Sequence, residues 1–500
     1  NFYLMKQTDI LIVTAPYTET EYPLQAPAII KASVEQHGYT ANTYDINYNF
    51  IKMEKTDLVK FNLLKNFFSF GTVKEKNNLN IIENYINETA ELILSKFNPK
   101  FIAISVFTYQ CQKFSEMFSQ KVKSIDPNIK IIFGGQGLTT QGINSSDSWV
   151  KTLKKSNILD HYIISEGEVA IINLLKEGKG KGVDNTNWQQ QLNLEHSPLP
   201  DYSDYNLDEY KGGQIMITGS RGCVRKCTFC DIHKHWKKFV YRSGKSIANE
   251  MILQSEKYKK WKFHFTDSLI NGSMKAYRDF ITIMAKHNST AKNRISWGGQ
   301  FIVRGLNTMT IKDWELTKLA GADWLALGVE SGSEAVRNHM KKQFSNQDLD
   351  EFMDQASINN INLEFLMIIG YPTETYNDFL DTLRMFKKYK KYQSIIKSVT
   401  LGSTLGVLPG TPLADDYGHD LSLQGGENFW IYKHNEELTF RERIKRRILA
   451  GEEILKMGYD IGKNESQLQL LHFLWGIHKN KQKQGVVDLN TSNVQEQKYS

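Results

Sequence analysis

The sequence predicts an α/β protein in which a doubly wound parallel sheet is followed by a partial (β/α)6 TIM-type barrel and a helical C-terminal region. Three observations carry this prediction. Strand-like and helix-like runs alternate over residues 8–180, a second alternating series covers 215–403, and three cysteines directly follow the first strand of that series. Such alternation is typical of parallel sheets. With 500 residues the chain is too long for one ordinary core.

The first domain is expected over residues 1–180. Its predicted strands are short apolar runs, as buried parallel strands should be, at 9–14, 40–45, 101–107, 129–133 and 161–164. Helices are predicted at 28–36, 112–124 and 168–177, with inserted helices between 50 and 95. Glycines gather after two of the strands, and ligands of such folds bind at the carboxyl ends of the strands.

The remaining chain divides into four segments. Periodicity fades over 181–210, which is interpreted as a linker, and the barrel is expected over 211–405. A helical region is expected over 406–480, with helices at 437–457 and 465–478, and a disordered tail over 481–500. The predicted barrel strands are 215–218, 262–266, 294–298, 324–329, 364–369 and 397–403.

The most informative feature is a CxxxCxxC loop formed by Cys223, Cys227 and Cys230. Three thiolates at this spacing can hold three irons of a 4Fe-4S cluster and leave the fourth iron open. A zinc site stays open as an alternative, because His233 or His235 could supply a fourth ligand. A disulfide is disfavoured, since the chain has only four cysteines and three of them lie in this loop.

Composition excludes several classes of protein. No stretch has the length and apolarity of a membrane span, and the start has no secretory signal. Four cysteines without a pairing framework indicate a reducing, cytoplasmic compartment. The net charge of +7 is small for this length. The basic runs Lys387–Lys391 and Arg441–Arg447 are interpreted as solvated helix faces rather than nucleic-acid patches.

With Phe229 before its last cysteine, the loop resembles the signature of the radical S-adenosylmethionine (SAM) enzymes. The resemblance extends over 210–405 through the stretches Phe265–Asn271, Trp297–Arg304, Gly328–Ser333 and Met367–Glu374. It implies a 4Fe-4S cluster on the three cysteines and reductive cleavage of SAM to a 5′-deoxyadenosyl radical. The residues that it implies as SAM contacts are Phe229, Asp267, Gln300, Arg304, Glu330, Ser331, Gly370 and Tyr371.

Residues 8–180 resemble the cobalamin-binding Rossmann-like domain that precedes the barrel in one branch of these enzymes. The cobalamin contacts that this resemblance implies are Ser105, Gly134, Gly135, Glu166, Gly167 and Glu168. One departure is the stretch Thr14–Leu24, which lacks the histidine of the family's Asp-x-His-x-x-Gly motif. Three alternatives therefore stay open: cobalamin without a histidine ligand, a domain that has lost cobalamin, and an ordinary flavodoxin-like domain.

The resemblance implies cobalamin-dependent methylation of an unactivated carbon, with radical rearrangement or cyclisation as the alternative. A tRNA methylthiotransferase-like enzyme is disfavoured, because those enzymes carry three further N-terminal cysteines and Cys111 is alone before the barrel. A non-enzymatic cobalamin sensor would not need SAM-shaped turns. A reductase, flavodoxin or ferredoxin is the expected electron donor. The sequence predicts no particular substrate, although the loop around Gly410–Pro412 is expected to close over it.

Overall fold

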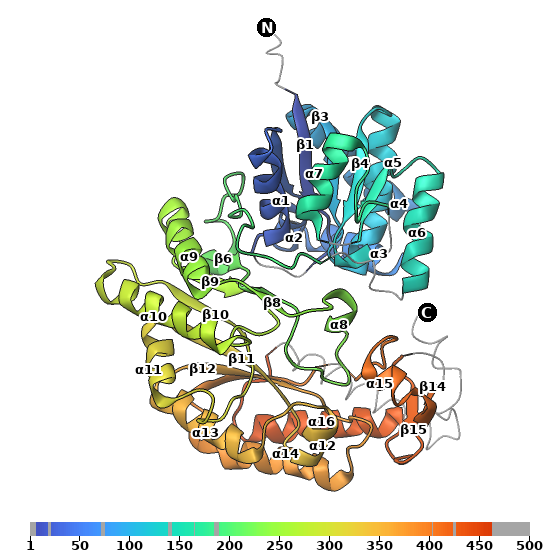
Figure 1. Cartoon of the computed structure of the whole chain (residues 1–500). Helices are drawn as coiled ribbons and strands as arrows, with labels where there is room; N and C mark the ends of the chain where they lie inside the picture. Colours follow the sequence, from blue (N-terminus) through green and yellow to red (C-terminus); the bar gives the residue numbers. More distant parts are fainter. Residues whose placement is uncertain are drawn as a thin grey trace, which may run out of the picture. The chain divides into compact units, whose positions relative to one another are not determined.

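The computed structural model describes residues 7–18, 22–71, 76–138, 143–164, 166–184, 190–402, 404–423 and 427–462. Contacts divide the chain into two compact units, the first consisting of Asn1–Ile217 and Gln254–Lys262 and the second of Thr218–Leu253 and Phe263–Ser500. Two parallel sheets dominate the structure (Figure 1).

The N-terminal sheet has the strand order β2-β1-β3-β4-β5 with every pair parallel. The strand order reverses between β1 and β3, which is where doubly wound folds bind their ligands. The five predicted strands are confirmed. Their bounds are β1 Thr8–Thr14, β2 Ala41–Asp45, β3 Pro99–Ser105, β4 Lys130–Gly134 and β5 His161–Ile163.

Both faces of this sheet are covered, because alternate residues of β1 enter two different cores. Leu11 and Val13 belong to one apolar cluster, and Ile10 and Ile12 belong to the other. Two helices contribute to the Ile10 side, α1 Gln25–Gln36 and α7 Gly167–Glu177. The other side takes side chains from α2 Ile46–Thr56, α3 Leu58–Phe70, α4 Lys76–Phe97, α5 Gln112–Ile125 and α6 Ile143–Lys155.

The second sheet has six strands in the order β13-β12-β11-β10-β9-β6, so its first and last strands stay unpaired with each other and the barrel is partial. All six predicted strands are confirmed. Their bounds are β6 Gln214–Ile217, β9 Lys262–Phe265, β10 Ser296–Phe301, β11 Ala322–Glu330, β12 Asn362–Met367 and β13 Ile396–Thr400.

Helices follow the barrel strands, and the sequence sets where several of them begin. Three start with a capping box, in which a Ser or Thr and the Asp three residues later bond to each other's backbone: Thr310–Asp313, Ser345–Asp348 and Thr375–Asp378. The helices are α9 Gly244–Tyr258, α10 Met274–Thr290, α11 Ile311–Leu319, α12 Glu334–His339, α13 Asn346–Ile358 and α14 Tyr376–Lys388.

The C-terminal region contains the predicted helix, α16 Phe440–Lys456, preceded by α15 Pro412–Asp415. Between them lies a two-stranded antiparallel hairpin that the sequence did not predict, β14 Leu421–Leu423 and β15 Trp430–Tyr432. The helix predicted at 465–478 and the tail lie outside the described residues.

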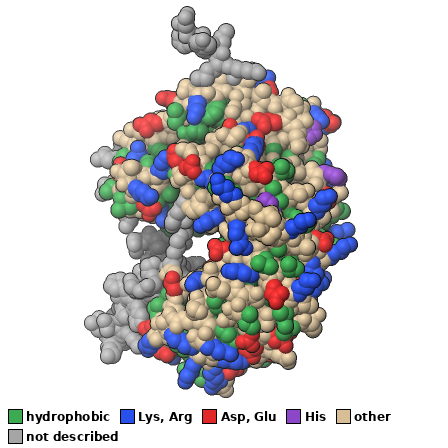
Figure 2. Space-filling view, turned by 90° about the vertical axis from the view of Figure 1, so that its left-hand side faces the viewer, with side chains coloured by type: hydrophobic (Ala, Val, Ile, Leu, Met, Phe, Trp, Pro, Cys, Tyr) green, Lys and Arg blue, Asp and Glu red, His purple; other side chains and the backbone are tan. Residues whose placement is uncertain are grey.

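The interpretation of Arg441–Arg447 as a solvated face is wrong. Arg443, Arg446 and Arg447 are at most 5% exposed, because backbone carbonyls and a buried carboxylate bind two of them. The lysines of 387–391 are exposed as predicted. On the face in Figure 2, basic and acidic side chains are interspersed. Within the described part of the chain, no helix is long and apolar enough to cross a membrane.

Candidate active site

The three cysteines lie in a loop closed at its base by two short antiparallel strands, β7 (Ser220–Arg221) and β8 (Val240–Tyr241). Gly222 begins the loop with φ +85°, and a Cβ there would lie 2.7 Å from the carbonyl oxygen of Lys238. A larger residue would force the base of the loop apart, so this position requires glycine. The short helix α8 (Ile232–His235) follows the last cysteine.

The environment of the three thiols disfavours free thiolates. Cys227 is buried, and Cys223 and Cys230 are half-buried. Burial raises the pKa of all three thiols, that of Cys230 to about 11, and the neighbouring thiols of Cys227 and Cys223 add to the shift at Cys230. A bound metal centre overcomes such a shift, since it deprotonates the thiols that coordinate it.

A single zinc ion would require the ligand side chains around the loop to converge on one point. Among the described residues, no three Cys, His, Asp or Glu side chains converge on a point that could hold one ion. A closed zinc site needs such convergence, whereas each cysteine of a 4Fe-4S site binds a different iron. His233 is disfavoured as a metal ligand, because its Nε2 lies at hydrogen-bond distance, 2.7 Å, from the carbonyl oxygen of Arg225.

Thr228, inside the loop, fastens the cysteines to the barrel. Its side chain is fully buried, and its hydroxyl lies 2.7 Å from the hydroxyl of Tyr371, which also contacts Nδ1 of His339 at 2.9 Å. The Thr228 backbone donates to the Met340 carbonyl and accepts from the Leu413 N–H. The predicted SAM residue Tyr371 is therefore also a support of the cysteine loop.

Asp267 supports the same loop at its start. Its carboxylate accepts from the Gly219 N–H at 2.8 Å and from the Ser220 hydroxyl at 2.5 Å. Burial raises the pKa of Asp267 to about 7. Arg242 donates to the Thr218 carbonyl and forms a buried ion pair with Glu250, so the segment before the cysteines is held from two sides. A direct contact of Asp267 with SAM stays a prediction.

Glu330 meets a half-buried lysine beside the cysteines. Glu330 has φ +66°, and its carboxylate lies 3.1 Å from Nζ of Lys342. Burial opposes the charge of Lys342, but Glu330 and the Cys227 thiol raise its pKa overall. Lys341 and Gln343 also have positive φ, so the turn that directs Lys342 inward is strained on both sides. Strained backbone of this kind gathers at functional sites.

Phe229 fills the space next to this pair. Its ring lies 5.9 Å from Nζ of Lys342. It also packs against an apolar cluster formed by Val336, Met340, Tyr371, Val407, Leu413, Leu421, Trp430, Tyr432 and Leu438. The structure thus brings Phe229, Glu330 and the cysteines together, as the sequence predicted for residues around one cluster.

Two further predicted SAM residues lie on turns after neighbouring strands, Ser331 after β11 and Gly370 after β12. Side chains of α14 form hydrogen bonds with the first turn, and α14 follows the second turn in the chain. The Ser331 hydroxyl is buried and accepts from the Ser333 N–H at 3.1 Å. The Ser333 hydroxyl in turn donates to Asp378 at 2.6 Å. Gly370 has φ +82°, and its N–H donates to both carboxylate oxygens of Glu374.

Gln300 and Arg304 lie at the end of β10 and after it. Gln300 is exposed, and its backbone carbonyl oxygen accepts from the Ile270 N–H. The guanidinium of Arg304 donates to the carbonyls of Asn271 and Gly272. Burial and the nearby charge of Arg225 lower the pKa of Arg304. The structure therefore ties Arg304 to the loop after β9, and its role toward SAM stays a prediction.

The predicted cobalamin residues divide into two groups. Ser105 and Gly134 are paired at the carboxyl ends of neighbouring strands β3 and β4. Gly135 has φ +109°, and a Cβ there would lie 2.5 Å from the Val106 carbonyl oxygen. Glycine at 135 therefore lets two loops of the chain itself approach closely.

Glu166, Gly167 and Glu168 start α7 after β5. A Cβ on Gly167 would lie 2.8 Å from the side chain of Ile30 on α1, so this glycine permits close packing of the two helices. Both glutamates are buried, and the Glu166 carboxylate accepts from the Gln191 N–H. Cys111 is also fully buried, as predicted for a structural cysteine.

Sequence reasoning missed several residues that hold the site together. Thr228 and Glu374 sit inside quoted motifs, where their polar side chains among apolar neighbours were the available signal. Lys342 and His339 follow the Gly328–Ser333 stretch at a distance that no local pattern marks. Arg446 belonged to a basic run whose burial only the tertiary structure reveals.

The fold and loop define an enzyme that carries an iron–sulfur cluster at the mouth of a partial barrel. The family model of the Radical SAM superfamily matches residues 217–386. This part of the chain is therefore a radical SAM domain, and the protein is a radical SAM enzyme; radical SAM enzymes use a 4Fe-4S cluster and SAM.

Two curated relatives are methyltransferases. The chain is 22% identical over 341 residues to an uncharacterized methyltransferase of Pyrococcus horikoshii. This alignment covers 63% of this chain and 71% of the relative. It is also 23% identical over 274 residues to the cytidylyl-2-hydroxyethylphosphonate methyltransferase of Streptomyces wedmorensis. This alignment covers 49% of each chain. The chain therefore spans about half the length of the second relative.

Two solved structures share the fold over most of the chain. The radical SAM methyltransferase TsrM of Kitasatospora setae, solved with cobalamin and a 4Fe-4S cluster, has a TM-score of 0.60 at 12% identity and covers 84% of this chain and 81% of its own. The cobalamin-dependent radical SAM enzyme OxsB, solved with aqua-cobalamin and SAM, has a TM-score of 0.63 at 16% identity. The superposition covers 94% of this chain and 72% of the OxsB chain. Both likenesses concern the fold.

Replacing Cys227 by Ala should abolish the iron–sulfur absorption and the cleavage of SAM, because the buried loop then lacks one of its three cluster ligands. Optical spectra and detection of 5′-deoxyadenosine after anaerobic reconstitution measure both properties. Cys111→Ala is the matched control and should keep both. A Cys227→Ala protein that retains either property would contradict the assignment.

Asp267→Asn should remove a pH-dependent part of the stability. The pKa of Asp267 rises from 3.8 to about 7 on folding, so the folded state binds more protons than the unfolded state between these values. The contribution of this carboxyl is therefore largest below about pH 4 and is lost as the pH rises toward about 7.

Urea unfolding from pH 5.5 to 8.5 tests this linkage. The unfolding free energy of Asp267→Asn minus that of the wild type should rise up to about pH 7 and then level off. The exposed Asp323→Asn should show no such trend. A difference for Asp267→Asn that is independent of pH would refute the buried carboxyl as the cause.

Proposed function

We propose that this radical SAM enzyme uses cobalamin to methylate an unactivated carbon atom. The observation that carries the proposal is that the sheet and the barrel, in one chain, share their fold with two enzymes solved with cobalamin bound. The two methyltransferase relatives support the reaction type. The substrate remains to be found, and a flavodoxin, ferredoxin or reductase is the proposed electron donor.

We infer that a flat macrocycle would bind at the carboxyl ends of β1 and β3. Phe107 and Tyr109, directly after β3, are each 39% exposed despite their large rings. Polar groups of Ser105 and Thr108 lie beside them. Exposed rings next to polar groups suit a corrin with its amide side chains. The stretch Thr14–Leu24 after β1 contains no histidine, so it would not offer cobalamin an imidazole.

When bound, these groups supply one-electron cleavage of the SAM sulfonium, hydrogen abstraction from carbon and delivery of a methyl group. The residues of the chain prepare the site for that chemistry. Cys223, Cys227 and Cys230 would hold the cluster, and Thr228 keeps their loop in place. Lys342 and Glu330 place a charged pair beside the cysteines, where they would orient the charged end of SAM.

The apolar cluster around Phe229 has a second task. It would exclude water from the side of the loop that it covers, because its members Met340, Leu413 and Trp430 are fully buried. A carbon radical is quenched by any reachable hydrogen donor, so a dry and rigid wall protects productive transfer. Cyclisation or rearrangement would use the same wall, and it is the second candidate because it needs no methyl donor.

Protein reconstituted anaerobically with iron, sulfide and hydroxocobalamin provides the test. After removal of unbound material, the spectrum should show cobalamin bands on top of the iron–sulfur absorption. SAM with a deuterated methyl group and titanium(III) citrate should then give S-adenosylhomocysteine only when cobalamin is present. Retention of the cluster with no bound cobalamin would refute the cobalamin proposal and favour the second candidate.

Phe107→Ala tests the proposed corrin surface. Because this exposed ring supports no core, its loss should weaken cobalamin retention by about tenfold and leave the cluster unchanged. Val59→Ala removes another exposed apolar side chain, on α3, and is the control. Equal cobalamin retention by both variants would contradict the position of the site.

A further inference from the structure

We propose that α16, which lies beyond the family match at 217–386, is a working part of the SAM site, with Arg446 as a positioning residue for the turn at 370–375. This inference rests on the proposed role of Gly370 and Tyr371 in SAM binding. It assigns to the C-terminal region the task of holding that turn in its binding shape.

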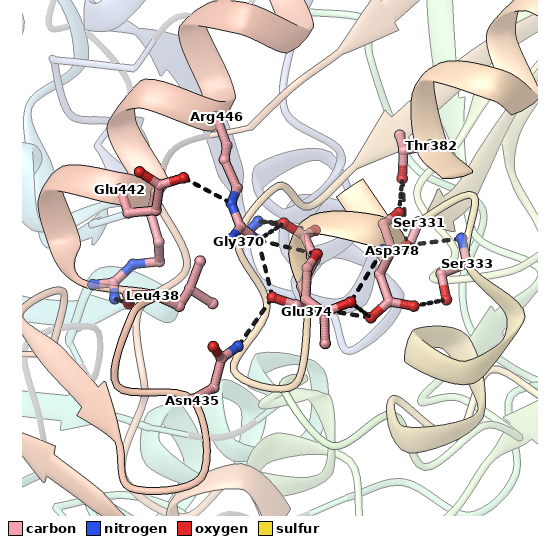
Figure 3. Close-up of polar contacts among 12 residues, drawn as sticks. Ser331, Ser333, Gly370, Glu374, Asp378, Thr382, Asn435, Leu438, Glu442 and Arg446 are labelled. Atoms are coloured by element: carbon pink, nitrogen blue, oxygen red, sulfur yellow. Dashed lines mark hydrogen bonds and ion pairs between the residues drawn. The ribbon is translucent and has the colours of Figure 1, made fainter. Parts of the chain in front are cut away.

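The turn is organised around one buried carboxylate. Glu374 is fully buried, and its two oxygens accept from the Gly370 N–H at 3.2 and 3.1 Å, which closes the turn on itself (Figure 3). Arg446 donates from α16 to the same carboxylate at 3.2 Å and to the carbonyl oxygens of Glu374 at 2.9 Å and Thr375 at 3.2 Å. One guanidinium therefore binds three points of the turn.

A second side chain from the C-terminal region binds the same turn. Asn435 donates to the carbonyl oxygens of Pro372 and Glu374, both at 3.0 Å. Glu442, one helical turn before Arg446, accepts from its Nε at 3.2 Å and fixes its orientation. The carbonyls of Pro372, Glu374 and Thr375 thus obtain hydrogen-bond donors from residues of the C-terminal region.

Arg443 forms the floor beneath Gly370. A Cβ on Gly370 would lie 2.7 Å from Cγ of Arg443, so the glycine rests directly on the arginine stem. The Arg443 guanidinium stacks 3.6 Å from the Trp430 ring and donates to three carbonyls, those of Asn428, Trp430 and Leu438. Burial lowers the pKa of Arg443 to about 9, which is still a charged group at neutral pH.

The network continues from this turn to the second predicted SAM turn. Asp378 accepts from the Thr375 N–H at 2.9 Å and from the Ser333 hydroxyl at 2.6 Å. Thr382, one turn further along α14, accepts from the Gly332 N–H at 2.9 Å. A shift of the 370–375 turn would therefore reach the backbone around Ser331 as well (Figure 3).

Loss of Arg446 should act on SAM more than on the cluster. Without it, the Glu374 carboxylate stays buried with only the Gly370 N–H, and an unpaired buried charge is unfavourable enough to move its surroundings. The cysteine loop keeps supports outside the 370–375 turn: Asp267 binds the Gly219 N–H, and the Thr228 backbone donates to the Met340 carbonyl and accepts from the Leu413 N–H.

The experiment compares Arg446→Ala and Arg446→Lys with the exposed Lys445→Ala on the same helix, all as reconstituted holoenzyme. Iron and sulfide content reports the cluster, and equilibrium dialysis with SAM reports affinity. Arg446→Ala should keep its cluster and bind SAM at least tenfold more weakly. Arg446→Lys keeps the positive charge but loses the planar guanidinium with its several fixed N–H donors, so it should recover part of the affinity. Lys445→Ala should match the wild type.

Asn435→Ala serves as the second variant if Arg446→Ala does not fold, and several-fold weaker SAM binding with an intact cluster is expected for it. SAM binding within twofold of the wild type in either variant with an intact cluster would overturn the inference. Parallel loss of cluster and SAM binding in both variants would also overturn it, since α16 would then support only the fold. A wild-type holoenzyme that does not bind SAM would instead sink the proposed function itself.

Discussion

The immobility of the cysteine loop is the constraint on which the rest of this structure depends. Three thiols can bind one cluster only if a long loop keeps them at fixed positions, and this loop contains no helix or strand between Gly222 and Cys230. The chain solves the problem with long-range hydrogen bonds. Thr228 reaches Tyr371 across 143 residues, and Asp267 holds the backbone of Gly219 from the neighbouring strand. Elements from both sides of the barrel thereby define a single geometry.

Buried and half-buried carboxylates perform the same task at the turns around the site. Asp267, Glu374 and Asp378 each bind backbone N–H groups of a loop at the end of a strand, where the barrel leaves amides unpaired. Burial raises the pKa values of Asp267 and Glu374 to about 7, although the hydrogen bonds that both carboxylates accept favour the charged form. Arginine from α16 compensates Glu374, which makes the C-terminal region and the barrel depend on each other.

Much of the fold was readable from the sequence, because buried parallel strands leave short apolar runs and capping residues mark where helices begin. The cluster loop was readable for the same reason, since three closely spaced cysteines need no tertiary context. The contacts that hold the site were not. Lys342 meets Glu330 only because a strained turn directs it inward, and Arg446 meets Glu374 across 72 residues of sequence. A basic run on an amphipathic helix resembles a solvated face until the carboxylate beneath it is known. The β14–β15 hairpin was missed because its strands have only three residues each.

The central claim is that three cysteines hold the cluster and leave one iron free to bind SAM. Electron–nuclear double resonance on the reduced holoenzyme tests it most directly, with SAM labelled by ¹⁵N at the amino group and ¹⁷O at the carboxylate. The account predicts hyperfine coupling of both labels to the cluster, and no coupling from the ¹⁵N of imidazole when histidines are labelled instead. Coupling to a histidine nitrogen, or no coupling to either SAM label under saturating SAM, would contradict it.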